Sequence, residues 1–212
     1  RAGRRRREGR VRRERAALAP VLAGAAPALA ALSATYAGEA LSTVADNPAQ
    51  AQERAGLADH AIEAAGQAIA AGRTGEAAFA IRTAEQSVAQ ATQLVQAITA
   101  LGSDLAAVET QSRALVAELQ SDVAAAQQLP DTGGALSAAA STTLQYLQAA
   151  QADLSGTARN PQRVFDALSA ANAQIDAAIA QGREALERTR RAEQMLEQTL
   201  TQAGSEIRTA RE

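Results

Sequence analysis

The chain has 212 residues, a formal net charge of −2, no cysteine and no tryptophan. The absence of cysteine excludes disulfides, thiolate nucleophiles and zinc–thiolate sites. Alanine dominates the 47% hydrophobic fraction and aromatic residues make up 2%. Each alanine buries little area at about 25 cal/mol per Å², so this composition predicts narrow helical bundles or coiled coils rather than a thick globular core.

Charge is distributed unevenly along the chain. Residues 1–15 contain nine of the 21 basic residues and two of the 23 acidic ones, so this basic segment carries +7 and the remainder −9. Such a segment is typical of a solvated tail, a nucleic-acid arm or a basic stretch beside a membrane. The residues expected to contact phosphates of lipid headgroups or nucleic acid are its arginines: Arg4, Arg5, Arg6, Arg7, Arg10, Arg12, Arg13 and Arg15.

A first helix is expected to begin within the basic segment and to end near Ala45. Pro20 and Pro27 would act as kinks or late start points, so the helix should be best formed from residue 28 onward. The apolar stretch around these prolines is short, and we predict that no part of this chain spans a bilayer. Because the sequence starts at Arg1 rather than at a methionine, we expect it to belong to a longer protein.

Asn47-Pro48 predicts the end of this helix and the start of the next, because proline pushes the preceding residue out of the helical region and suits a first helical turn. The second helix is expected over about residues 48–71. Its apolar face should contain Leu57, Ile62, Ala65 and Ile69.

A break at Gly72 to Gly75 precedes a long third helix, expected over about residues 75–127. Its apolar residues follow steps of three and four, as in a coiled coil, with polar Ser112 and Asp122 in the distal part of the seam. A loop at residues 130–134 then leads to a fourth helix over about 135–157.

Asn160-Pro161 repeats the earlier Asn-Pro pair, and both are followed by alanine and isoleucine at the same offsets. This repetition predicts a duplicated helical hairpin. A fifth helix should start at Pro161. A break near Gly182 is possible by analogy with Gly72, but the unbroken apolar phase favours one continuous helix.

These elements predict an all-α protein made of elongated antiparallel helical hairpins, or spectrin-like three-helix bundles that share long helices. We divide the chain into the basic segment, a first bundle over residues 16–105 and a second over residues 106–212. The apolar positions Leu196, Leu200 and Ile207 lie at the open end of the second bundle.

Few residues suggest chemistry. His60 with Glu63 could supply two metal ligands, but an exposed helical histidine is the simpler interpretation. The turn from Gly72 to Gly75 lacks the lysine and preceding strand of a phosphate loop. Four aromatic residues are expected to fill gaps between helices, and they are Tyr36, Phe79, Tyr146 and Phe165. We therefore predict no enzyme activity, no metal and no cofactor.

The order of elements resembles the long helical region of actinobacterial TPM-domain-containing proteins. The resemblance rests on the arginine cluster, the Asn-Pro turn after Leu41, the stretch from Ile81 to Leu105, and the stretch from Arg190 to Ile207. It implies a helical module on the cytoplasmic side of the cell membrane, as a fragment of a single-pass protein, with the arginines as a positive-inside segment.

We therefore expect a non-enzymatic structural or protein-interaction module tethered next to a membrane. Its partners would be an anionic membrane surface, reached through the N-terminal arginines, and a protein or a second copy, bound through helix faces. The alternative is a nucleic-acid-associated coiled coil with an arginine-rich arm.

Overall fold

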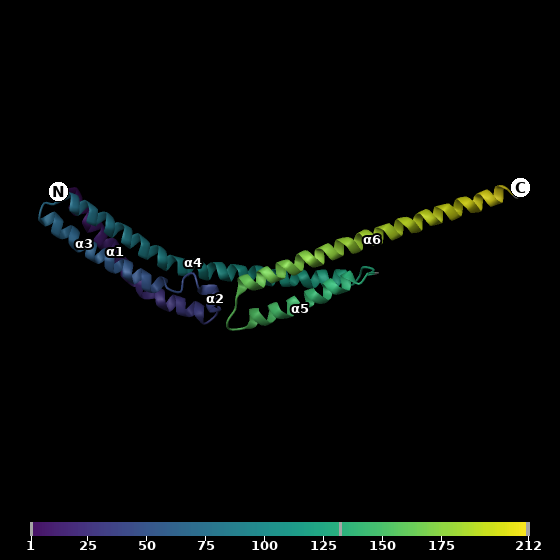
Figure 1. Cartoon of the computed structure of the whole chain (residues 1–212), viewed down its shortest axis with the longest axis horizontal. Helices are drawn as coiled ribbons and strands as arrows, with labels where there is room; N and C mark the ends of the chain where they lie inside the picture. The colour runs from purple at the N-terminus through teal and green to yellow at the C-terminus, as the bar shows by residue number, and fades with distance from the viewer. Residues whose placement is uncertain (1, 132, 211–212) are drawn as a thin grey trace. The chain divides into compact units, whose positions relative to one another are not determined.

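The computed structural model describes residues 2–131 and 133–210, which form helices joined by short loops (Figure 1). Among these residues the only β contact is an isolated bridge between Tyr36 and Arg159. The all-α prediction is confirmed. The elements are α1 (Ala2–Ser33), α2 (Gly38–Leu41), α3 (Asn47–Ala70), α4 (Thr74–Ala126), α5 (Ala135–Ser155) and α6 (Pro161–Thr209).

The chain divides into two compact units. Unit 1 comprises the residues up to Val108 together with Ser155–Gln162, and unit 2 comprises Glu109–Leu154 together with the residues from Arg163 onward. Helix α4 therefore supplies its first part to unit 1 and its second part to unit 2.

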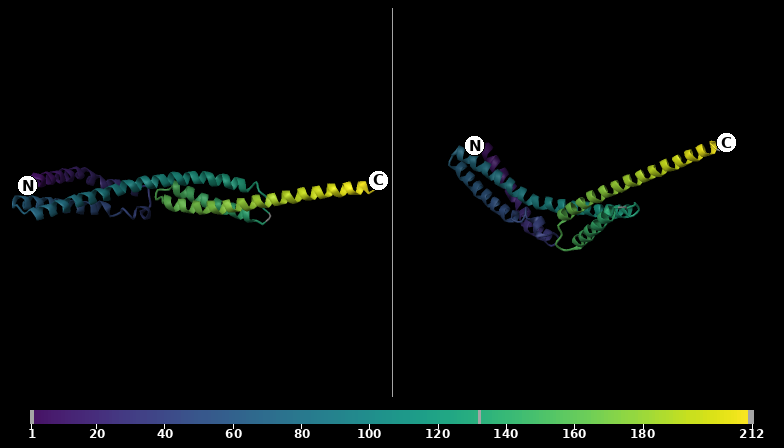
Figure 2. Two further views of the ribbon diagram at one scale, coloured as in Figure 1. Left: turned by 90° about the horizontal axis from the view of Figure 1, so that it is seen from above. Right: turned by 45° about the vertical axis from the view of Figure 1, so that its right-hand side comes forward.

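In unit 1, the helices α1, α3 and the first part of α4 lie side by side (Figure 2). Alanines line much of the contact, so the helices approach closely and each layer buries little apolar area. Gly102 shows how close the approach is, because a Cβ at this position would lie 2.9 Å from Cδ2 of Leu32. The central core of unit 1 consists of Leu18, Leu22, Ala25, Val44, Ala51, Ala55, Ala58, Val88, Ala91, Val95 and Ile98.

Helix α1 differs from its prediction. It is well formed from Ala2 and ends at Ser33, whereas the sequence indicated a helix that becomes regular at residue 28 and continues to Ala45. Pro20 and Pro27 are tolerated because both lie on the exposed side. The carbonyl that each proline leaves without its helical partner belongs to an exposed alanine four residues earlier, where water can hydrogen-bond to it.

The chain leaves α1 at a pairing with the segment that precedes α6. The backbone N–H of Ala37 donates to the carbonyl of Arg159 at 2.8 Å, and the N–H of Arg159 donates to the carbonyl of Thr35 at 3.1 Å. The guanidinium carbon of Arg159 lies 5.7 Å from the centre of the buried Tyr36 ring. These contacts hold Ala37 in an extended conformation after the turn at Ala34 and Thr35, which explains why the helix does not continue.

In unit 2, the second part of α4, α5 and the first part of α6 enclose a core in which Leu119, Leu168 and Ile175 are fully buried. Before α5, the Asp131 carboxylate accepts hydrogen bonds from the Ser137 hydroxyl at 2.6 Å and from the Ser137 backbone N–H at 2.8 Å. The hydroxyl bond is the main reason that the pKa of Asp131 is lowered, followed by the backbone N–H groups of this turn.

Helix α6 is continuous, as its unbroken phase predicted. Gly182 forms no break and is buried, because Cδ1 of Leu136 would lie 2.7 Å from a Cβ at this position. The glycine is therefore a close-approach residue between α6 and the start of α5 rather than a helix terminator.

Three predicted core residues are exposed, namely Leu57, Phe79 and Tyr146. The buried face of α3 includes the alanines at 51, 55 and 58 and Ile62, which are spaced by three or four residues. Leu57 is one position away from this face and is therefore exposed. Phe79 is 67% exposed because the buried face of α4 passes through Ala77, Ala80 and Ile81 instead. Tyr36 is buried, as expected, and lies in the loop after α1.

Candidate interaction surfaces

The basic segment is the first part of α1 and packs into unit 1. Val11 is buried against Ala61, Ile62 and Ala65 of α3 and against the first turns of α4. Apart from Gly9, the residues of α1 that are not fully exposed follow steps of four and three along the helix, and they are Arg4, Glu8, Val11, Arg15, Leu18, Leu22, Ala25, Leu29 and Leu32. One packing face, or seam, therefore runs from the apolar part of α1 through the basic segment. The spacing of these residues could have predicted it from the sequence, but the high density of arginines made the segment look solvent-exposed.

Three of the eight candidate arginines bond to acidic residues of the protein. Arg15 Nη2 lies 2.7 Å from Oδ2 of Asp59, and Arg10 Nη2 lies 2.5 Å from Oε1 of Glu85. Arg12 pairs with Glu8 at 2.7 Å within α1. Since such partly exposed pairs are worth about 0–1 kcal/mol each, they orient these side chains more than they stabilise the fold.

The other candidates are available to a ligand. Arg5, Arg6, Arg7 and Arg13 are exposed and form no ion pair with another described residue, and Arg4 is half-buried in the seam. Arg6 and Arg13 are seven residues apart, two helical turns along the outer side of α1. Of the predicted set, the outward-facing arginines are therefore the ones whose side chains are not engaged by acidic residues of the protein.

The same helix has an unusual outer face beyond the arginines. From Ala16 to Leu32 every residue is Ala, Leu, Pro, Val or Gly, so no polar side chain faces water along four turns. Val21 on this face is 41% exposed. A helix at the surface of a water-soluble bundle normally has a polar outer face, and a helix that is apolar on all sides is normally covered.

By length and composition, α1 is the one described helix that could cross a membrane. The prediction that no part of this chain spans a bilayer stays a prediction, but its premise, that the apolar stretch is too short, is wrong. The premise failed because Pro20 and Pro27 were expected to interrupt the apolar stretch, whereas α1 passes through both without a break.

A shallow groove between α1 and α4 continues the apolar face. Its floor contains Leu18, Val21 and Val88, and Glu14 and Glu85 lie at one end. Arg10 contacts both carboxylates, since its Nε is 3.5 Å from Oε1 of Glu14. The groove is open and apolar, with its charged groups already paired, and it offers no arrangement for covalent chemistry.

The second surface is the C-terminal part of α6. The seam that is buried at Leu168, Ile175 and Ile179 continues in phase to Leu196, Leu200 and Ile207, which are 61%, 64% and 57% exposed. Within unit 2, no other described helix lies beside this part of α6 (Figures 1 and 2). The face has the spacing of a packing surface and no packing partner within the unit.

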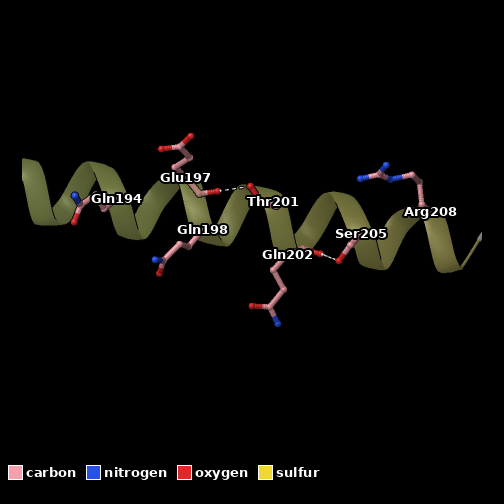
Figure 3. A pocket seen from close by; sticks show the side chains of 7 residues that line it. All are labelled: Gln194, Glu197, Gln198, Thr201, Gln202, Ser205 and Arg208. Carbon is pink, nitrogen blue, oxygen red and sulfur yellow. Dashed lines mark hydrogen bonds between the residues drawn. The ribbon is translucent and has the colours of Figure 1, made fainter.

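The polar side of the same stretch forms a shallow open hollow, lined by Gln194, Glu197, Gln198, Thr201, Gln202, Ser205 and Arg208 (Figure 3). All seven residues belong to α6, and the two hydrogen bonds drawn there run from hydroxyls to backbone carbonyls of the same helix. A hollow along one helix encloses no substrate, so this site carries no chemical interpretation.

The residues considered for chemistry are not brought together. His60 and Glu63 are exposed on α3, and the described residues contain no group of three side chains suited to a metal. In the turn before α4, Arg73 pairs with Glu76 at 2.9 Å.

Asp122 has a raised pKa, mainly because burial disfavours its charge and secondly because Asp176 repels it, while Arg183 acts in the opposite direction.

Both asparagines of the Asn-Pro pairs are buried, a role that the turn interpretation did not include. Asn47 Nδ2 donates to the carbonyl of Leu94 at 2.9 Å, which ties the start of α3 to the middle of α4. Asn160 Nδ2 donates to Oε2 of Glu39 at 3.4 Å.

Compared with known protein families, curated proteins and solved structures, the chain matches none at a significant level.

Proposed function

We propose that this chain is a non-enzymatic helical module that rests against an anionic membrane surface through α1 and offers the free face of α6 to a protein partner. The observation that carries the proposal is the combination on α1 of outward arginines and an outer face without polar side chains. Interfacial helices combine the same features, with cations at the headgroups and apolar residues below them.

The electrostatic contribution can be gauged from the available arginines. Each basic residue near an anionic leaflet contributes about 1 kcal/mol, so Arg5, Arg6, Arg7 and Arg13 together contribute about 4 kcal/mol at low salt. This attraction alone gives weak, reversible binding, and the apolar face from Ala16 to Leu32 adds to it. Arginine-rich segments beside membranes favour the cytoplasmic side, which we propose as the location.

The resemblance to the helical region of TPM-domain-containing proteins agrees with this proposal. We propose that the module belongs to a larger membrane protein of that kind, in which α1 lies close to the bilayer and the remaining helices extend the contact surface. Surface attachment would then reinforce tethering, because a second weak contact on a tethered chain acts at high effective concentration.

The test is co-sedimentation of the chain with vesicles of phosphatidylcholine, with or without phosphatidylserine. We expect binding only to the anionic vesicles and a loss of about 30-fold in the double variant Arg6→Gln/Arg13→Gln, which removes two contributions of about 1 kcal/mol. The matched control is Arg54→Gln/Arg82→Gln, which removes the same charge from exposed arginines of α3 and α4. Equal losses in the two variants would contradict a specific role of α1.

Duplex DNA at the same salt concentration provides the competing experiment. Binding to phosphates by counterion release is steeply salt-dependent for both ligands, so the comparison must hold salt constant. Tighter binding to DNA than to anionic vesicles, lost in Arg6→Gln/Arg13→Gln, would refute the membrane proposal in favour of the nucleic-acid alternative.

A further inference from the structure

We propose that α1 binds the phosphate monoester of a membrane lipid at a site centred on Gly9. Three arginines form the site, and they are Arg5, Arg6 and Arg13. The inference rests on the proposed function, because it names the headgroup chemistry that the basic part of α1 selects. It goes further than net charge, which by itself gives no preference among anionic surfaces of equal potential.

Gly9 lies on the outer side of α1 and is nevertheless partly covered. It is two residues from the buried Val11, or about 200° around the helix, which places it nearly opposite the seam. No other described residue of α1 outside the seam is less than fully exposed. Gly3 and Gly24 of the same helix are exposed, and a Cβ at either position would have no neighbour within 4 Å.

The cover over Gly9 comes from an arginine of the same helix. A Cβ at Gly9 would lie 3.7 Å from Nη1 of Arg13, so the guanidinium of Arg13 leans back over the glycine. Long helical side chains normally lean over the preceding turn in this way. The guanidinium therefore lies above a position that has no side chain of its own.

Four arginines surround Gly9 on the helix surface. Arg5 and Arg6 lie four and three residues before it, and Arg12 and Arg13 lie three and four residues after it. Side chains at these spacings are neighbours on a helix, with Cβ atoms about 5–6 Å apart. The missing side chain of Gly9 leaves a notch among these arginines in which an anion can approach the helix backbone.

The acids of the basic segment do not neutralise this notch. Glu8 pairs with Arg12 at 2.7 Å, and Glu14 lies 3.5 Å from Arg10. The pair of Glu8 and Arg12 is turned toward α3, because a Cβ at Gly66 of that helix would lie 3.3 Å from each of the two side chains.

The three other arginines around Gly9 keep their charge available. Arg5, Arg6 and Arg13 are exposed and form no ion pair with another described residue. The notch is therefore bordered by three cations whose positive charge no described acid compensates.

A phosphate monoester matches three guanidinium groups better than the other anionic headgroups do. It has three terminal oxygens and a charge of about −1.5 to −2 at neutral pH, and guanidinium groups bind such oxygens in bidentate fashion. A phosphate diester has two free oxygens and one charge. The headgroup of phosphatidylserine also has an ammonium group, which the arginines repel.

The surroundings of the notch favour a lipid over a soluble phosphate. Ala16 is seven residues beyond Gly9, two turns along the same side of α1, and from Ala16 to Leu32 the outer face has no polar side chain. A lipid phosphate bound at Gly9 thus places its acyl chains beside apolar turns of the same helix. A soluble phosphate ester makes no use of these turns.

Co-sedimentation with phosphatidylcholine vesicles that contain either phosphatidic acid or phosphatidylserine, at contents adjusted to equal zeta potential, tests the site. We expect the full chain to bind the phosphatidic acid vesicles about tenfold more tightly, the equivalent of one further charge-assisted hydrogen bond. The ratio of the two affinities is the measured quantity, because it cancels any apolar contribution that both vesicles share.

Gly9→Leu fills the notch without changing any charge, and its side chain would lean over the preceding turn toward Arg5 and Arg6. We expect it to reduce the preference to less than about twofold, through loss of that hydrogen bond. The matched control is Gly56→Leu, which places leucine at a similarly half-buried glycine of α3, where a Cβ meets no atom within 4 Å. The control should keep the preference, and circular dichroism must show equal helix content in both variants.

Equal binding to the two kinds of vesicle by the unmodified chain overturns the inference and leaves the proposed function standing. A preference that Gly9→Leu retains overturns the placement of the site at Gly9. No binding to either anionic vesicle contradicts the proposed function, and the inference with it.

Glycerol 3-phosphate distinguishes a lipid ligand from a soluble one. By titration calorimetry we expect it to bind at least about 100-fold more weakly than phosphatidic acid vesicles do, because it lacks the acyl contact. Binding of glycerol 3-phosphate as tight as that of the vesicles would overturn the assignment to a lipid.

Discussion

Gly182 provides the sharpest test of the close packing in unit 2. Replacing a glycine in a helix interior by alanine normally stabilises the helix by about 1 kcal/mol. At Gly182 the new Cβ would lie 2.7 Å from Cδ1 of Leu136 and 3.4 Å from Cδ1 of Leu129. Leu136 is buried, so it can move only by disturbing its neighbours, and overpacking of this kind costs about 1–3 kcal/mol.

We therefore expect Gly182→Ala to change the free energy of unfolding between no effect and a loss of about 2 kcal/mol, instead of the usual gain. The assay is urea unfolding followed by circular dichroism. Leu136→Val supplies the matched background, because valine has no Cδ atom and removes the closest contact. In that background Gly182→Ala should stabilise unit 2 by about 1 kcal/mol, which gives a coupling energy of about 1–3 kcal/mol between the two sites.

The reasoning would be refuted if Gly182→Ala stabilised the protein equally in the wild-type and Leu136→Val backgrounds. Such additivity would mean that α6 and the start of α5 are further apart than the structure has them. A large loss in both backgrounds would place the strain at Leu129 or elsewhere and would equally contradict the role of Leu136.

Three further predictions concern buried or capped polar groups. Asn47→Ala should cost about 1–3 kcal/mol in urea unfolding, because it leaves the carbonyl of Leu94 without its 2.9 Å donor, whereas exposed Gln52→Ala should cost little. The lowered pKa of Asp131 means that its stabilising effect is present above the ordinary value of 3.8 and is lost as the pH falls toward the lowered value. Asp131→Ala should thus lower unfolding stability at neutral pH and lose that effect in strong acid; an unchanged difference would contradict the capping role. The raised pKa of Asp122 has the opposite effect on stability, because the ionised carboxylate is disfavoured in the folded state. Asp122 therefore destabilises the fold when the pH is above its raised pKa and has no such effect below its ordinary value of 3.8. Asp122→Asn should thus stabilise unit 2 at neutral pH but not in strong acid.

The helices could be predicted from the sequence wherever local signals agreed. Pro48 and Pro161 mark the starts of α3 and α6, and Gly72 with Thr74 marks the junction of α3 and α4 within about two residues. The continuity of α6 followed from an apolar phase that runs through Gly182. In each case the spacing of apolar residues and the turn chemistry indicated the same element, so tertiary contacts had little to change.

The end of α1 could not be predicted because its cause is non-local. Residues 34–45 have helix-forming composition, but Thr35 and Ala37 form backbone hydrogen bonds with Arg159, far along the chain. The exposure of Phe79 has a similar origin. A large aromatic residue was expected to be buried, yet alanines one or two positions away provide the close approach that this fold uses instead.

The candidate surfaces were predictable in outline but not in detail. The sequence marks eight arginines as a single basic cluster, whereas the helix divides them by direction. Arg15 points toward an acid of α3, Arg10 toward an acid of α4, and Arg12 toward an acid of α1 itself. Arg6 and Arg13 face outward. Charge density alone therefore overstates the number of side chains available to an anionic ligand.

One geometric feature of α1 links its arginines to its prolines. Arg6, Arg13, Pro20 and Pro27 are spaced by seven residues, so they lie along one outer line of the helix, opposite the seam. A proline in that line costs little, because the carbonyl it frees faces outward, and the absence of polar residues around it leaves the line apolar. The outer side of α1 therefore changes from cationic to apolar along its length. A planar anionic surface can satisfy both parts at once, the headgroups with the arginines and the acyl boundary with the apolar turns.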